Sequence, residues 1–262
     1  MINDILTLNA LFTRIKSPYE EAKKIFTYYY APKYFKAIKI IYTQVNGLYY
    51  NRFKENIGNH KYRYNFKNAQ RTFLFTAMLI DGFNLSKKKL NPELAIYLLM
   101  SAILCDIGLI DKNDETGNNR TDSTINFINR HIDEFQIGEE DADIIGRLIR
   151  FTGNMTDEEF FSTSDDEKIA GSILATAYFI ERLTDEQFKE NLLLLHEEFI
   201  SANQDNGKKN DDLDNTVEFY ETLKRKMVDY SRFHFKHRHQ VDRDMLTELM
   251  DGKIPSLEKV NC

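Results

Sequence analysis

Residues 98–110, LLMSAILCDIGLI, decide the fold of this chain. They follow an Asn-Pro-Glu sequence at 91–93, in which asparagine suits a helix N-cap and proline suits the first helical turn. An apolar run of this length after such a start predicts a buried helix. The helix carries Cys105 and Asp106 at its end, and Gly108 helps to stop it. A carboxylate in this place lies either at the surface or beside a pocket.

The remaining apolar residues mostly recur at intervals of three and four, and only four prolines interrupt the chain. We also expect a turn at Asp81-Gly82 and a polar surface loop over 112–120, next to whatever pocket Asp106 lines. No strand pair is evident, so the fold class is all-α, a helical bundle. Besides the helix that carries Cys105, the predicted helices are 20–30, 32–46, 65–80, 122–134, 139–150, 165–183 and 184–200.

The chain divides into a helical domain over 1–200, a linker over 201–215 and a C-terminal helix with a tail over 216–262. The linker, SANQDNGKKNDDLDN, is almost wholly polar and cannot bury itself. The helix after it is an extra element beyond the bundle, as are the first helices of the chain.

Composition restricts the partners and the compartment. The net charge is −6 and the pI about 5.6, which speaks against a nucleic-acid-binding protein. The first residues lack a signal-peptide pattern, and no segment approaches eighteen uninterrupted apolar residues, so we expect neither secretion nor a membrane. Two cysteines cannot form a framework of disulfides. We therefore expect a cytoplasmic protein.

Three motifs in order resemble the HD-domain phosphohydrolases, in particular their cyclic-nucleotide phosphodiesterase branch. In ILCDIG, Cys105 stands where that family has histidine, and Asp106 matches its aspartate. In GNHKYRYNFKNAQ, His60 matches the histidine that protonates the leaving oxygen, whereas Tyr64 replaces a metal-binding histidine. In GSILATAYFIER, Tyr178 replaces the last aspartate ligand. The resemblance implies an HD-like bundle that keeps Asp106 alone among four metal ligands.

The lost ligands matter because a bound metal lowers the pKa of water and supplies hydroxide at neutral pH. A phenol with a pKa near 10 is a poor ligand for Mg²⁺ or Mn²⁺. Cys105 suits Zn²⁺ better, but one thiolate and one carboxylate fall short of a catalytic zinc site. Free cysteine is also among the most buried residue types, which favours a structural Cys105. On this interpretation Tyr64 and Tyr178 fill the vacated space.

A partly buried Asp106 needs a donor or a cation, and His60, Arg63 and Arg71 are the candidates. The first functional hypothesis is a regulatory or ligand-binding pseudoenzyme. It needs no cofactor, and its cleft either binds a nucleotide or another phosphorylated small molecule or has closed. His60, Arg63, Tyr64, Cys105, Asp106 and Tyr178 form its candidate binding site.

Two alternatives stay open. One is a metal-dependent phosphohydrolase with Mn²⁺, Mg²⁺ or Zn²⁺, in which Asp106 and Cys105 work with His60 as the catalytic residue and with Asp111 or Asp114 from the loop. The other is a helical interaction protein that meets a second copy or a protein partner through its C-terminal helix.

Overall fold

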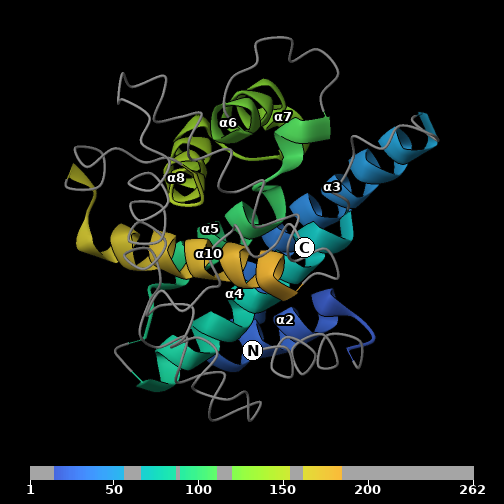
Figure 1. Cartoon of the computed structure of the whole chain (residues 1–262). Helices are drawn as coiled ribbons and strands as arrows, with labels where there is room; N and C mark the ends of the chain where they lie inside the picture. Colours follow the sequence, from blue (N-terminus) through green and yellow to red (C-terminus); the bar gives the residue numbers. More distant parts are fainter. Residues whose placement is uncertain (1–14, 56–65, 87–88, 111–119, 154–161, 185–262) are drawn as a thin grey trace, which may run out of the picture.

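The structure is a computed structural model and describes residues 15–55, 66–86, 89–110, 120–153 and 162–184 (Figure 1). All regular elements in these ranges are helices, so the predicted all-α class is confirmed. The predicted linker over 201–215, the C-terminal helix and the helix over 184–200 lie outside the described residues, apart from Thr184 itself.

Eight α-helices and two 3₁₀ segments make up the described part of the chain. In chain order they are α2 (Pro18–Tyr29), η1 (Pro32–Tyr34), α3 (Phe35–Glu55), α4 (Phe66–Ser86), α5 (Pro92–Leu104), η2 (Ile107–Ile110), α6 (Arg120–Arg130), α7 (Ile132–Phe135), α8 (Glu139–Arg150) and α10 (Asp165–Thr184).

Helix α5 is the centre of the bundle and contacts α3, α4, α8 and α10. Its start is as the sequence predicts, because the Asn91 side chain accepts a hydrogen bond from the Glu93 N–H at 2.8 Å and Pro92 is the first helical residue. The segment Pro92–Ile110 is long and apolar enough to cross a membrane, but 78% of its apolar 18-residue stretch is buried inside the protein. Burial against four helices accounts for its apolar character as a core element.

The prediction of a turn at Asp81-Gly82 is wrong, because helix α4 continues through both residues to Ser86. Asp81, Gly82 and Phe83 are all buried. The hydroxyl of Tyr29 in α2 donates to Asp81 Oδ1 at 2.5 Å, which gives this buried carboxylate a partner. Packing against α2 thus outweighs the turn preference of the Asp-Gly pair.

The segment predicted as one helix over 122–134 is two helices. His131 leaves the helical conformation, with φ −119° and ψ 22°, and separates α6 from α7. Its ring stacks on Phe127 with the ring centroids 4.0 Å apart, and its Nδ1 lies 2.8 Å from the Phe127 carbonyl oxygen. The change of direction lets α7 bury Phe135 before Gln136 ends it in the left-handed region at φ 55°.

Helices α5 and α8 are joined by a side-chain hydrogen bond at the edge of the core. The Tyr97 hydroxyl donates to Asp141 Oδ1 at 2.6 Å, while Asp141 Oδ2 accepts from the Gly138 N–H at the start of α8. The hydrogen bond to this carboxylate, together with desolvation and the charges around it, raises the pKa of Tyr97 to about 12. Asp141 therefore links the cap of α8 to the central helix.

Candidate functional site

The residues that follow α5 form the centre of the candidate site. Helix α5 ends at Leu104, and Cys105 and Asp106 form the turn that leads into η2. Asp106 is only 2% exposed, so its carboxylate lies inside the bundle instead of at a surface helix end. A carboxylate buried to this degree requires charged or hydrogen-bonding partners.

The cation beside Asp106 is Arg120, the first residue of α6. Its Nη1 lies 2.8 Å from Asp106 Oδ1, and both side chains are almost fully buried. The same nitrogen donates to the Cys105 carbonyl oxygen at 3.1 Å. The prediction of a surface loop through residue 120 is therefore wrong at Arg120, because this charge pairs inside the protein.

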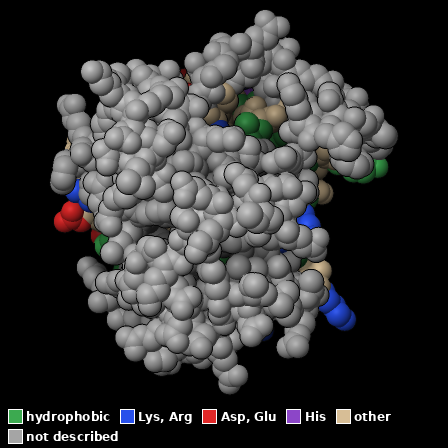
Figure 2. Space-filling model, in the orientation of Figure 1, with side chains coloured by type: hydrophobic (Ala, Val, Ile, Leu, Met, Phe, Trp, Pro, Cys, Tyr) green, Lys and Arg blue, Asp and Glu red, His purple; other side chains and the backbone are tan. Residues whose placement is uncertain are grey.

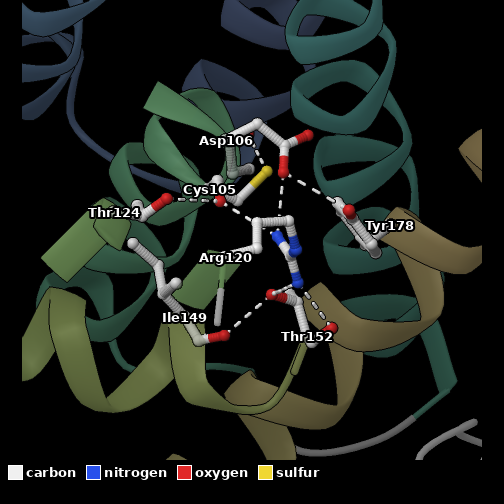
Figure 3. Close-up of polar contacts among 8 residues, drawn as sticks. Cys105, Asp106, Arg120, Thr124, Ile149, Thr152 and Tyr178 are labelled. Carbon is white, nitrogen blue, oxygen red and sulfur yellow. Dashed lines mark hydrogen bonds and ion pairs between the residues drawn. The ribbon is translucent and has the colours of Figure 1, made fainter. Parts of the chain in front are cut away.

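The other side of the guanidinium group faces the end of α8 (Figure 3). Arg120 Nη2 donates to the Thr152 carbonyl oxygen at 2.8 Å and to Thr152 Oγ1 at 3.1 Å. One planar guanidinium thus holds the end of α5 and the chain after α8 together. Arginine suits this position because its donors form a rigid fork and its charge is permanent.

Tyr178 of α10 closes the cluster from a third direction (Figure 3). The Tyr178 hydroxyl donates to Asp106 Oδ1 at 3.3 Å. The Arg120 guanidinium carbon lies 4.5 Å from the centroid of the Tyr178 ring, a cation–π arrangement. The buried polar cluster, defined as the buried residues Asp106, Arg120 and Tyr178 together with the half-buried Thr152, therefore joins the end of α5 to α6, α8 and α10.

Gly108 in η2 allows α6 to approach closely enough for Arg120 to reach Asp106. A Cβ at this position would lie 2.4 Å from the Thr124 backbone nitrogen and 2.6 Å from the Ser123 carbonyl oxygen. Backbone atoms cannot move away as a side chain can, so only glycine fits here. Nearby, the Thr124 hydroxyl donates to the Cys105 carbonyl oxygen at 3.3 Å and fixes the same turn.

Cys105 is fully buried, and its Sγ lies 3.4 Å from the Ala102 carbonyl oxygen. These contacts match the interpretation of Cys105 as a small buried side chain.

A second buried ion pair involves Arg71, one of the three candidates for pairing with Asp106. Arg71 Nε lies 4.0 Å from Glu181 Oε1, between α4 and α10.

The structure brings together three of the residues predicted for the site: Cys105, Asp106 and Tyr178. His60, Arg63 and Tyr64 lie outside the described residues, as do Asp111 and Asp114. Sequence reasoning missed Arg120 and Thr152. The available signal was the requirement of a buried carboxylate for a cation, together with an arginine at the start of the next amphipathic helix.

The described residues do not fit a divalent metal at Asp106. Among them, no group of three or more His, Cys, Asp and Glu side chains is placed to hold an ion. Asp106 Oδ1, which would be a metal-binding oxygen, already accepts from the Arg120 guanidinium and the Tyr178 hydroxyl. A guanidinium supplies positive charge but, unlike a metal ion, carries no bound water whose pKa it could lower.

Searches with protein-family models, among curated proteins and among solved structures found no match to this chain. Its described residues form an all-α bundle with a buried arginine–aspartate pair near the centre.

Proposed function

We propose that this chain is a non-catalytic, HD-like helical protein with a regulatory or scaffolding role. The observation that supports the proposal most strongly is the 2.8 Å contact between Arg120 and Asp106 inside the bundle. In the resembling hydrolases an aspartate at this point of the motif binds a metal, and the metal activates water. In this chain the same carboxylate binds a permanent organic cation, which cannot perform that step.

The burial of the cluster supports a closed site over a catalytic one. Asp106 is 2% exposed, Tyr178 3% and Arg120 8%. A substrate that binds Asp106 Oδ1 would have to displace the Arg120 guanidinium or the Tyr178 hydroxyl, and each displacement would remove a hydrogen bond from a buried polar group. The cluster therefore favours stability of the bundle, and any nucleotide or phosphorylated small molecule would bind next to it, not in contact with Asp106.

The proposal is tested by metal content and by hydrolysis. The purified protein is incubated with Mn²⁺, Mg²⁺ or Zn²⁺, freed of excess metal and analysed for elements. In parallel, it is assayed with cyclic nucleotides and with bis(4-nitrophenyl) phosphate. We expect far less than one metal ion per chain and hydrolysis at background. Stoichiometric metal or hydrolysis that disappears in Asp106→Asn would overturn the proposal and restore the phosphohydrolase alternative.

The ligand-binding version of this function is tested separately by thermal unfolding with a panel of nucleotides. A ligand at a hundred times its Kd stabilises the folded state by about 2.7 kcal/mol, which raises Tm by an easily measured amount. A nucleotide that raises Tm in the wild type and in Asp106→Asn would bind beside the cluster, as proposed. If no nucleotide shifts Tm, the scaffolding role is the version that stands.

A further inference from the structure

One end of the molecule carries exposed apolar side chains. Among the described residues, large hydrophobic side chains at the surface include Tyr28, which is 77% exposed, Leu85 at 46% and Tyr34 at 38%. They belong to the last turn of α2, the last turn of α4 and η1. These segments are held together, because the Tyr30 hydroxyl donates to the Leu90 carbonyl oxygen at 3.0 Å and accepts from the Asn84 side chain at 3.0 Å.

Lysines lie beside two of these apolar side chains, Tyr28 and Tyr34. Lys24 lies one helical turn before Tyr28 on the same face of α2; its side chain is 80% exposed, and its Nζ is 4.0 Å from Glu21 Oε1. Lys33 Nζ is 5.1 Å from the centroid of the Tyr34 ring, and Lys36 is exposed on the first turn of α3. Residues 16–39 contain six lysines and only two acidic residues. We name this surface the basic–aromatic end: Lys24, Tyr28, Lys33, Tyr34, Lys36 and Leu85.

The opposite charge gathers on α7 and the first turns of α8. Residues 131–146 contain six carboxylates and neither lysine nor arginine. Of these carboxylates, the acidic end comprises the exposed ones, Asp133, Glu134, Glu139, Glu140 and Asp143. Figure 1 places α7 and α8 at the top of the molecule and α2 with the end of α4 at the bottom. In the same orientation, Figure 2 shows few described side chains, and basic ones stand out at the right and lower right edges of the surface.

We propose that the basic–aromatic end binds the acidic end of a second copy of this chain. The two surfaces are complementary in charge and lie at opposite ends of the molecule, so the association is head-to-tail and either closes into a ring or extends. The charges steer the encounter, and Tyr28, Tyr34 and Leu85 contribute the apolar area that charge pairs at a surface do not supply. This inference rests on residues apart from the buried polar cluster and is independent of the proposed function.

The test measures association by sedimentation velocity over a range of protein concentrations, at low and at high salt. We expect a concentration-dependent increase in mass at low salt that weakens at 0.5–1 M salt, because the Debye length falls from about 10 Å at 0.1 M to about 3 Å at 1 M. Lys33→Glu with Lys36→Glu is expected to weaken association about tenfold, which corresponds to about 1.4 kcal/mol. Glu139→Lys with Glu140→Lys is expected to do the same.

Mixing provides the decisive comparison. The two charge-reversed variants are each repelled from themselves, but they carry complementary ends toward each other, so an equimolar mixture should recover association. The matched control is Lys16→Glu with Lys67→Glu, which changes the net charge equally at exposed positions outside the basic–aromatic end and should associate like the wild type. A monomeric wild type at low salt would overturn the proposal. So would wild-type association that both variants leave unchanged, or a basic–aromatic end that binds vesicles rich in phosphatidylserine while the chain stays monomeric.

Discussion

Replacing Arg120 by methionine would remove the cation from the centre of the bundle while keeping most of the side-chain volume. The guanidinium now contacts Asp106 at 2.8 Å, the Cys105 carbonyl oxygen at 3.1 Å and the Thr152 carbonyl oxygen at 2.8 Å. Without it, the 2% exposed Asp106 loses the cation that contacts its Oδ1. Breaking one side of a buried ion pair costs about 3 to 5 kcal/mol. Urea unfolding, followed by circular dichroism, should show this loss of free energy of unfolding.

The control is Arg147→Met, because Arg147 pairs with Glu167 at the same distance of 2.8 Å but its side chain is 48% exposed. Exposed pairs contribute about 0 to 1 kcal/mol. Asp106→Leu combined with Arg120→Met should lose less than Arg120→Met alone, since no buried charge is left unpaired. The reasoning fails if Arg120→Met costs no more than Arg147→Met.

Three further outcomes are expected. Gly108→Ala should lower the free energy of unfolding by several kcal/mol, because the added Cβ would lie 2.4 Å from a backbone nitrogen. Gly47→Ala, whose Cβ would have nothing within 4 Å, should raise the free energy of unfolding by about 0.5 to 1 kcal/mol. Chemical denaturation of both variants measures these changes. The pKa of Tyr97 is raised from 10.0 to about 12, so the stability that the protonated phenol contributes is complete below pH 10 and is lost as the pH rises toward 12. Tyr97→Phe should therefore make Tm fall less steeply over that interval, and an unchanged slope would contradict this expectation. Asn91→Ala should cost about 1 kcal/mol through the lost cap of α5, and a cost near zero in the same denaturation series would show that the cap is dispensable.

Local signals in the sequence were sufficient for several helices. The predicted bounds of α8, 139–150, agree with the structure, and those of α10 differ at its end by one residue. Both helices begin with acidic residues, which favour a helix N-terminus; α8 buries one apolar face, whereas α10 is buried on most sides from Ala170 onward. The turn expected at Asp81-Gly82 was wrong because packing of α4 on α2, including the Tyr29 contact, is a long-range effect.

The centre of the site was predictable in part. The motif order pointed to Asp106 and Tyr178, which lie 72 residues apart in sequence and form a hydrogen bond. Arg120 was missed because its local sequence pointed to the surface: it follows the polar, glycine-containing stretch that predicted a surface loop. Burial of its charge depends on partners at the ends of α5 and α8, and those partners become neighbours only in the folded bundle.

The distance in sequence between Asp106 and Tyr178 also orders events during synthesis. Asp106 and Arg120 emerge from the ribosome together, but Thr152 follows later and Tyr178 last. Until α10 has been made, the buried polar cluster lacks the ring that lies against the Arg120 guanidinium and the hydroxyl that donates to Asp106. We therefore expect the cluster to gain its full set of contacts only after α10, the last described helix, has been synthesised.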